Sequence, residues 1–388
     1  MDQSFKVHFI MATKKKPVWK KNPIPGGKNL YINSVGISGD GQLVIAGNYY
    51  HDYSSTANHT PTSDPSFTVG VFLWNAAGKL QWKDTFSATE GVYWTALSRD
   101  GSYAASGGLL SQGKGFIYAY DATSGNKTLN YATGARVNRV ALSQDGTYLV
   151  AGDRSIYLFK RTGANWSAPQ IIPCDTGDTV VSVDICGNGQ WIVAGTYNGN
   201  VMLIHNNSGT LGTPVTWQQP SGSIYWVAMA FGGSGFVVGA RNASAYGFNT
   251  STFSGTSAPA WNVTLSGCSR CGCVAISDDG SLVSAVGNVS KTGKVFLYSI
   301  QGNTAQQLWA NTTLHNPNST SLDSVGKFVT VADGQPDGTP GAFYLYSGAG
   351  APQWTCATSN MSWPMQISAD ASAIAAGSDD SDVYYFTP

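Results

Sequence analysis

Short apolar runs alternate with polar turns along most of this chain, and one such pattern recurs. Each copy has two apolar stretches joined by a turn of the Asp-Gly type, as in VALSQDGTYLVAG at 140–152. Apolar alternation with a period of two predicts β-strands, and Asp-Gly tolerates the positive φ that a tight hairpin needs. Eight copies are present, with turn positions at Gly41, Gly101, Gly146, Gly189, Gly233, Gly280, Gly326 and Ala371.

The copies recur about every 45 residues, after a longer first interval of about 60. Each hairpin is followed by a third apolar run, such as NVMLIHN from Asn200, and a short fourth run that often carries tryptophan, such as VTWQQ around Trp217. Four antiparallel strands in this period are typical of one β-propeller blade. We predict an all-β, eight-bladed propeller of four-stranded antiparallel blades. Seven blades would require one spurious copy, and the weakest is the one around Gly326.

The two ends of the chain complement each other. An unpaired fourth strand surrounds Trp19, and an unpaired third strand lies at 383–388. We predict that the N-terminal strand completes the last blade and closes the ring, because closure removes an open sheet edge. The expected organisation is an N-terminal tail at 1–16 and a single propeller domain at 17–388, with an insertion at 48–68 in the first blade.

Composition narrows the range of partners. Of the 388 residues 11% are charged and the formal net charge is zero, so nucleic acid and anionic membranes are not implied partners. No run reaches the roughly 18 apolar residues of a membrane helix. The lysines at 14–16, 20 and 21 are expected to be solvated. Frequent Asn-x-Ser/Thr triplets and few Lys and Glu residues favour an extracytoplasmic or secreted location over a cytoplasmic one.

Six cysteines include the cluster Cys268-Ser-Arg-Cys271-Gly-Cys273. A zinc site usually needs four ligands, but only three thiols are local and no histidine is near in sequence. We therefore expect a local disulfide or buried free thiols, and we predict no metal site. Two acidic runs, at 378–382 and at Asp333 with Asp337, lack the spacing of a calcium loop and are expected to form turns.

The repeated Ser-x-Asp-Gly phrase resembles the inner hairpins of WD-repeat and YVTN-type propellers. FLWNAAGKLQWKD at 72–84 and LYSGAGAPQWT at 345–355 resemble the Gly-x-x-x-Trp repeat of quinoprotein-like eight-bladed (PQQ-like) propellers, in which the tryptophan docks against the neighbouring blade. The resemblance covers the chain from about Pro17 onward. It is strong for fold and weak for function, because this fold hosts many unrelated activities.

A quinoprotein dehydrogenase would imply pyrroloquinoline quinone, calcium, an aspartate base and two adjacent cysteines. This sequence has no Cys-Cys pair, and Glu90 is its only glutamate. It therefore resembles a non-enzymatic branch of that superfamily. We predict no cofactor, with pyrroloquinoline quinone or calcium as the weaker alternative.

The richest candidate site lies in the loops that lead into the innermost strand of each blade. In a propeller these loops gather at one mouth of the central channel, where aromatic faces, amides and guanidiniums suit flat ligands. The alternative is that the same side chains pack between blades. The candidate mouth residues are Asn33, Tyr93, Trp94, Asn138, Arg139, Tyr225, Trp226, Arg270 and Trp363.

The insertion is a second candidate, because insertions on propellers often project and contact partners. A plain variable loop is the alternative, and a metal site through its histidines and aspartate would be loosely spaced. The candidate partner-loop residues are Tyr49, Tyr50, His51, Asp52, Tyr53 and His59.

The sequence contains few features that are typical of enzymes. It has five histidines, and it has no nucleophile elbow or phosphate loop. We predict a non-catalytic binding or scaffold propeller whose partner is a protein, a glycan or a small ligand. The alternatives are a propeller enzyme, such as a quinone-dependent oxidoreductase, and a structural subunit of a surface layer or filament. An enzyme should show converging ionisable groups with perturbed pKa values at the mouth, whereas a scaffold should show aromatics and amides.

Overall fold

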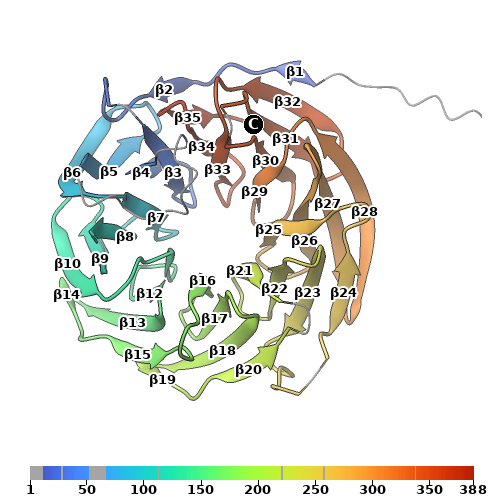
Figure 1. The fold of residues 1–388 in the computed structure, drawn as a ribbon, viewed down its shortest axis with the longest axis horizontal. Coiled ribbons are helices and arrows are strands. Elements are labelled where there is room, and N and C mark those ends of the chain that lie inside the picture. Colours follow the sequence, from blue (N-terminus) through green and yellow to red (C-terminus); the bar gives the residue numbers. More distant parts are fainter. Residues whose placement is uncertain are drawn as a thin grey trace, which may run out of the picture.

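The computed structural model describes residues 12–27, 29–51, 67–111, 113–219, 222–256, 258–336 and 338–388. These residues form strands and no helix, and the strands surround a central channel (Figure 1). The prediction of an all-β propeller of four-stranded antiparallel sheets is confirmed. None of the described residues belongs to a helix that could cross a membrane.

Successive sets of strands follow one another around the ring, each beginning with the strand nearest the channel. The first set consists of β3 (Leu30–Ile37), β4 (Leu43–Tyr50), β5 (Phe67–Asn75) and β6 (Leu80–Ala88), and the second consists of β7 (Gly91–Leu97), β8 (Tyr103–Ser111), β9 (Lys114–Asp121) and β10 (Lys127–Thr133). The third set consists of β11 (Arg139–Leu142), β12 (Tyr148–Gly152), β13 (Ser155–Thr162), β14 (Asn165–Trp166) and β15 (Gln170–Pro173). The fourth set consists of β16 (Val180–Ile185), β17 (Trp191–Thr196), β18 (Asn200–Asn207), β19 (Thr210–Leu211) and β20 (Val215–Gln218). The remaining sets are β21 (Ile224–Met229), β22 (Gly235–Ala240), β23 (Ser244–Asn249) and β24 (Trp261–Thr264); β25 (Arg270–Ile276), β26 (Leu282–Val289), β27 (Thr292–Gln301) and β28 (Thr304–Thr313); β29 (Pro317–Leu322), β30 (Phe328–Asp333), β31 (Ala342–Ser347) and β32 (Pro352–Ala357); β33 (Ser362–Ile367), β34 (Ile374–Ser378) and β35 (Val383–Phe386) with β2 (Trp19–Lys21).

The strand pairing is consistent with seven to eight blades. Over the described residues, the hydrogen-bonded sheets number seven, and one of them has eight strands. That sheet joins the sets β3–β6 and β7–β10 through a contact of β4 with β7, where Tyr49 lies opposite Gly91. The count is seven if this sheet is one blade and eight if it is divided there.

The N-terminal strand completes the last blade, as the sequence predicts. β2 pairs antiparallel with β35, with Trp19 opposite Tyr385, and their rings stack at 5.2 Å between centroids. β1 (Thr13–Lys14) then pairs in parallel with β32. Figure 1 shows both strands along the outside of the ring. The chain therefore contacts the ring from Thr13, within the segment expected to be a tail, and residues 1–11 lie outside the described residues.

The repeated phrase forms a continuous girdle at one face of the ring. Within the turns, polar side chains form hydrogen bonds with one another and with backbone N–H groups. For example, Asp145 Oδ1 accepts bonds from the Ser143 hydroxyl at 3.1 Å and from the Thr147 N–H at 2.9 Å. Between turns, backbone N–H groups donate to carbonyls of the next repeat. These bonds run from Gly39 to Arg99, Asp100 to Gln144, Gln144 to Gly187, Gly187 to Phe231, Gly232 to Asp278, Asp278 to Ser324, Ser324 to Ala369 and Asp370 to Gly39.

Tryptophans of the outer strands dock on glycine turns of the neighbouring set. The Trp82 ring lies against Gly125, where an added Cβ would be 2.6 Å from the Trp82 Cγ, and its Nε1 donates to the Ala122 carbonyl at 2.7 Å. Gly125 also has a φ of 74°, a conformation that favours glycine. Trp19 on Gly78 and Trp309 on Gly350 repeat this arrangement. Trp354, from the second Gly-x-x-x-Trp unit of the sequence, does not follow this arrangement: its ring lies 4.9 Å from that of Phe386, and its Nε1 has no hydrogen-bond partner among the described residues.

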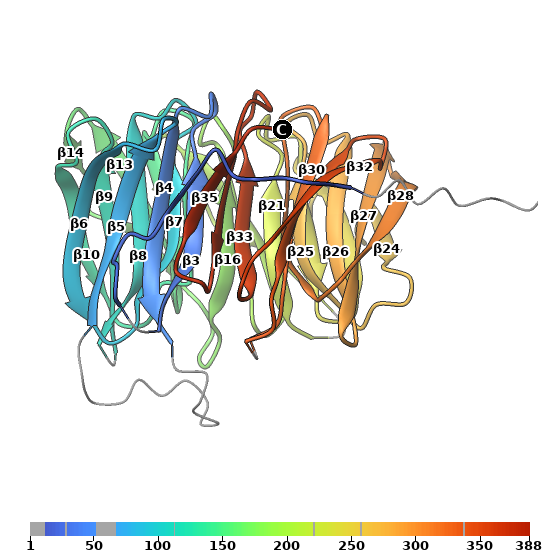
Figure 2. The same cartoon turned by 90° about the horizontal axis from the view of Figure 1, so that it is seen from above.

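Buried Val, Ala, Ile and Phe side chains fill the space between neighbouring sets. Figure 2 shows the strands running from one face of the ring to the other. Each innermost strand therefore has a repeated turn at one face, which we call the turn end of the channel. Its lead-in loop lies at the opposite face, which we call the channel mouth.

Candidate functional site

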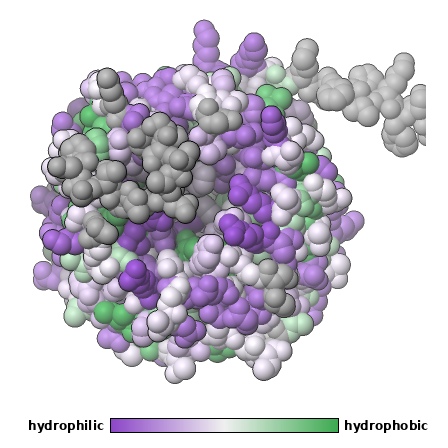
Figure 3. Space-filling model, in the orientation of Figure 1, coloured by the Kyte–Doolittle hydropathy of each residue, from purple (hydrophilic) through white to green (hydrophobic). Residues whose placement is uncertain are grey.

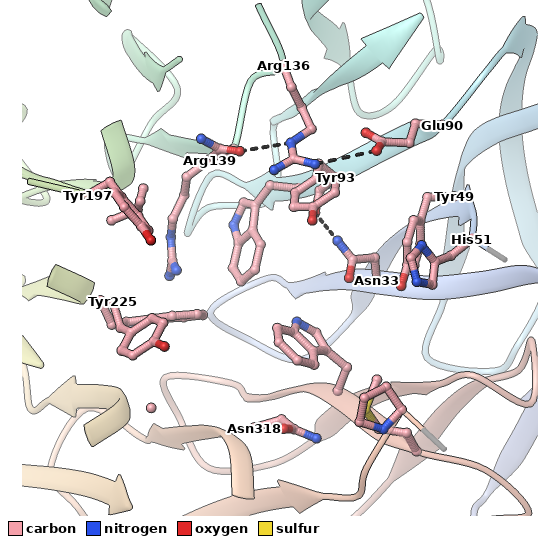
Figure 4. Close-up of a pocket in the computed structure, with 18 of the residues that line it drawn as sticks. Asn33, Tyr49, His51, Glu90, Tyr93, Arg136, Arg139, Tyr197, Tyr225 and Asn318 are labelled. Carbon is pink, nitrogen blue, oxygen red and sulfur yellow. Dashed lines mark hydrogen bonds and ion pairs between the residues drawn. The ribbon is translucent and has the colours of Figure 1, made fainter. Parts of the chain in front are cut away.

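The nine residues predicted for the channel mouth all line one cavity. Its volume is about 900 Å³, which falls within the range of ligand-binding pockets. Figure 3 shows this face of the ring, where mostly hydrophilic side chains surround a central hollow. Figure 4 shows side chains from several sets pointing into that hollow. The lead-in loops therefore converge as the sequence predicts, whereas binding itself stays a prediction.

Arg139 occupies the inner part of this cavity. Its guanidinium carbon lies 4.0 Å from the ring centroid of Trp94 and 3.6 Å from that of Trp226. The two indoles contact each other at 5.4 Å with an angle of 74° between their planes. Attraction between a guanidinium and an indole face holds the side chain in this position. Burial lowers the pKa of Arg139 to about 10, so the side chain remains charged at neutral pH.

A second arginine, Arg136, forms the wall beside the insertion. Its Nη1 lies 3.4 Å from Glu90 Oε1, and its Nε donates to Asn138 Oδ1 at 3.1 Å. Its guanidinium carbon also lies 4.1 Å from the ring centroid of Tyr93. Burial, the largest cause, raises the pKa of the Tyr93 hydroxyl. In this wall the one glutamate of the chain is paired with Arg136 through Oε1, whereas its Oε2 is buried and has no hydrogen-bond partner among the described residues.

Arg270 lies on another wall of the cavity, at the start of β25. When the Asn288 amide is oriented with its oxygen toward Arg270, that oxygen accepts bonds from Nε at 3.1 Å and Nη2 at 2.8 Å. The Arg270 guanidinium carbon is 5.6 Å from the ring of Tyr225. Two of the three arginines that line the cavity are therefore tied to neighbouring polar groups.

The asparagines of the mouth serve partly as ties between neighbouring sets of strands. Asn33 Nδ2 donates to the Tyr93 carbonyl at 2.8 Å, and Asn138 Nδ2 donates to the Val180 carbonyl at 2.7 Å. Asn318, which was not among the predicted residues, makes the same kind of bond to the Ser362 carbonyl at 2.9 Å. The alternative interpretation of the mouth residues was that they pack between blades. The amide nitrogens of these asparagines fit that interpretation, because they bond to carbonyls of the next set of strands.

The described part of the insertion divides between two locations. Tyr49 and His51 line the mouth cavity, and their rings stack at 6.0 Å. Tyr50 instead stacks on Phe67 at 3.5 Å, outside the cavity lining. The predicted partner-loop residues Asp52, Tyr53 and His59 lie outside the described residues.

Other residues line the cavity without having been predicted. They are Glu90, Arg136, Thr179, Val181, Tyr197, Gly272, Asn316, Asn318, Gly334, Pro336 and Met361. Arg136 belongs to the lead-in loop that supplied Asn138 and Arg139, so a wider window around that loop would have included it. The lead-in to β29, which carries Asn318, supplied no predicted residue, although it has the same place in the repeat. Tyr197 follows β17, and the repeated phrase gives no signal that this position faces the channel.

The aspartates of the two acidic runs form hydrogen bonds and ion pairs within the chain, and the cysteines form no disulfide among the described residues. Asp333 is buried and accepts bonds from the Ala342 N–H at 2.8 Å and the Tyr344 hydroxyl at 2.7 Å. Asp380 and Asp382 lie 3.6 and 2.7 Å from the Lys20 ammonium. Asp337 lies outside the described residues.

All six cysteines are free thiols, and burial raises the pKa of Cys273 to about 12. Among the described side chains, no group of His, Cys, Asp and Glu is arranged to hold a metal.

Comparison with known proteins shows which repeats and structures this chain is similar to. The family model described as "WD domain, G-beta repeat" matches residues 126–160 and 169–205. The first of these segments contains Arg136, Asn138 and Arg139. This chain is a β-propeller, and the two matched segments are similar to WD-type repeats. A search of curated proteins finds no sequence that matches it.

Three solved structures resemble most or nearly all of the ring. Sqt1 of Chaetomium thermophilum, bound to the N-terminus of ribosomal protein L10, has 10% identity and a TM-score of 0.70, with coverage of 93% of this chain and 98% of that one. The Dos1 propeller has 14% identity and a TM-score of 0.67, covering 96% and 95%. U3-55K has 16% identity and a TM-score of 0.58, covering 79% and 90%. These likenesses establish the fold. The WD-type part of the resemblance is supported by the family model at 126–160 and 169–205, whereas nothing supports the quinoprotein part.

Proposed function

We propose that this propeller is a non-catalytic scaffold that binds a segment of a protein partner in the mouth cavity. The observation that carries the proposal is the convergence of lead-in loops from many repeats on one cavity lined by aromatic rings and guanidiniums. Aromatic and arginine side chains are enriched where proteins recognise one another. A cavity of about 900 Å³ has room for a few side chains of an inserted segment.

The ionisable groups of the mouth favour binding over catalysis. Burial lowers the pKa of Arg139 to about 10 and raises the pKa of Tyr93. Both shifts leave the group in its ordinary charge state at neutral pH, so neither side chain becomes a proton donor or acceptor poised near that pH. The nearest carboxylate in the lining, Glu90, is paired with Arg136. This arrangement supports a binding surface, in which charge and flat rings select a partner.

The solved structure of Sqt1 contains the N-terminus of a ribosomal protein. It is a propeller of similar extent that binds a polypeptide terminus. The likeness concerns the fold, and it supports a polypeptide as the class of ligand to test first. A glycan or a flat small molecule would contact the same aromatic faces, and either one is an outcome that the test below separates from a peptide.

A display library of short random peptides tests the proposal. We expect full-length protein to enrich specific peptides, and we expect simultaneous replacement of Trp94, Trp226 and Trp363 by alanine to abolish their binding. Trp363→Ala alone should weaken binding without disturbing the Trp94–Trp226 contact, which guards against a folding defect in the triple variant.

The matched control replaces exposed apolar residues of the outer surface by alanine. Leu80, Ile171 and Leu308 are 41%, 47% and 48% exposed, and their replacement should leave peptide binding intact. If no peptide binds, or if the mouth variants bind as wild type does, the proposed function is wrong.

A further inference from the structure

One cation of the mouth cavity has no acceptor. Within the described part of the chain, no hydrogen bond or ion pair is made by the Arg139 guanidinium, whose contacts are the two indole faces at 4.0 and 3.6 Å. A guanidinium carries five N–H donors in a planar fork and stays protonated. Buried donors without acceptors are costly, and in native structures they usually meet water or a ligand. Arg139 lines the cavity, so a bound molecule can reach its donors.

Asp184, on β16, interacts electrostatically with Arg139 but forms no ion pair with it. Burial raises the pKa of the Asp184 carboxyl. Its two oxygens already accept bonds from the Ile185 and Met229 N–H groups, each at 2.9 Å. Asp184 therefore does not accept a hydrogen bond from Arg139.

The other two arginines of the lining are already engaged. Arg136 is paired with Glu90, and Arg270 is bound by the amide oxygen of Asn288. The lining therefore contains three arginines against one carboxylate, in a chain of zero net charge. Arg139 is the member of this set whose donors await a partner, and the excess positive charge favours an anionic one.

We propose that Arg139 is the receptor for a carboxylate of the bound polypeptide, either an Asp or Glu side chain or a C-terminal carboxylate. This inference rests on the proposed function and names the chemistry of the partner. The contacts of the guanidinium are these two indoles, and none of its N–H groups has an acceptor among the described residues. A planar carboxylate matches such an edge with two parallel hydrogen bonds. A phosphate group would benefit from further cations, but the neighbouring arginines are occupied.

Paired peptide libraries test this directly on the full-length protein. Each fluorescent sublibrary fixes the central residue of a short peptide as Asp, Glu, Asn, Gln or phosphoserine, with an amidated C-terminus. A further Asn sublibrary has a free C-terminus. Dissociation constants are measured by fluorescence anisotropy. We expect the Asp or Glu sublibrary, or the free C-terminus, to bind at least about tenfold tighter than the amidated Asn and Gln sublibraries, as a charge-assisted hydrogen bond predicts.

Variants at Arg139 then identify the receptor. Arg139→Gln should remove the carboxylate preference while keeping the weaker binding of the Asn sublibrary, which also shows that the cavity is still folded. Arg139→Lys should keep only a part of the preference, because it retains the charge and loses the planar fork. The matched control is Arg99→Gln. Arg99 also stacks on an aromatic ring, Phe231 at 4.0 Å, but at the turn end of the channel, so this variant should keep the full preference.

The outcomes separate the two proposals. Equal binding of Asp and Asn sublibraries, or a preference that survives Arg139→Gln, overturns the carboxylate receptor and leaves peptide binding in place. A stronger preference for phosphoserine than for Asp and Glu also overturns it, in favour of a phosphate ligand. If no sublibrary binds the wild-type protein, the proposed function fails and this inference fails with it.

Discussion

Two arginines stand at opposite ends of the same channel, and their surroundings differ. Arg99, at the turn end, lies 2.7 Å from Asp278 and 4.0 Å from the centre of the Phe231 ring. Arg139, at the mouth, contacts two indoles and has no acid within ion-pairing distance among the described residues. The turn end is complete within the chain, whereas the mouth presents donors that need something else to bind.

This difference follows the pattern of the sequence. The turn end is built from the repeated phrase, whose polar groups bond one another and the next repeat in a closed girdle. The mouth is built from the lead-in loops, where the repeats diverge. Residues that recur from repeat to repeat form the hydrogen bonds that hold the ring together, whereas residues that differ between repeats can form a binding site. We therefore propose that the turn end stabilises the ring and that the mouth recognises a partner.

The largest effect is expected where the ring closes, because without closure the channel would not have two defined ends. Trp19 is 9% exposed, stacks on Tyr385 and donates to the Ala76 carbonyl at 2.9 Å. Trp19→Ala should lower the free energy of unfolding by about 3 kcal/mol, in the range for a buried tryptophan. Chemical denaturation provides the measurement, with Val18→Ala, at a residue that is 58% exposed, as the control. Wild-type stability in Trp19→Ala would mean that β2 does not hold the ring together.

A pair of glycine substitutions compares the two ends directly. An added Cβ at Gly39 would lie 2.8 Å from the Arg99 carbonyl oxygen, within the girdle, whereas one at Gly272, in the mouth lining, would find its nearest atom at 3.4 Å. Gly39→Ala should therefore cost about 1–3 kcal/mol through overpacking. Gly272→Ala should stay within about 0.5 kcal/mol. Denaturation midpoints measure both, and equal losses at the two positions would contradict the division between frame and site.

The two arginines themselves provide a smaller contrast. Arg99→Gln removes a partly exposed ion pair and a stacking contact, and should cost about 1 kcal/mol. Arg139→Gln removes two stacking contacts but also a charge that burial disfavours, and because these effects offset each other we expect a smaller loss of stability than in Arg99→Gln. Thermal unfolding of both variants at neutral pH tests this order. A greater loss in Arg139→Gln than in Arg99→Gln would make Arg139 a structural residue and weaken the case for a ligand.

Much of the fold could be predicted because the repeat is local. The Ser-x-Asp-Gly turns, the glycines that receive tryptophan and the complementary ends each depend on residues close in sequence or related by the repeat. The lead-in loops were predictable for the same reason, since their position in the repeat places them at the mouth. This is why Trp94, Arg139 and Trp226 could be expected in one cavity.

The partners of these side chains could not be predicted from the pattern. Arg99 and Asp278 belong to well-separated repeats that meet across the channel, and no sequence spacing relates them. The engagement of Arg136 by Glu90, and the absence of any acceptor for Arg139 among the described residues, depend on side-chain directions in the folded ring. The sequence predicted most of the residues that gather at the mouth, and the structure separates the two arginines that have acceptors from Arg139, which has none among the described residues.

The most direct test of this division is a crystal structure of the full-length protein with the tightest peptide from the libraries. We predict a peptide bound at the mouth, against Trp94, Trp226 and Trp363, with a carboxylate oxygen about 3 Å from a nitrogen of Arg139. A peptide bound at the turn end or along the outer strands, or one at the mouth with Arg139 still unpaired, would contradict it.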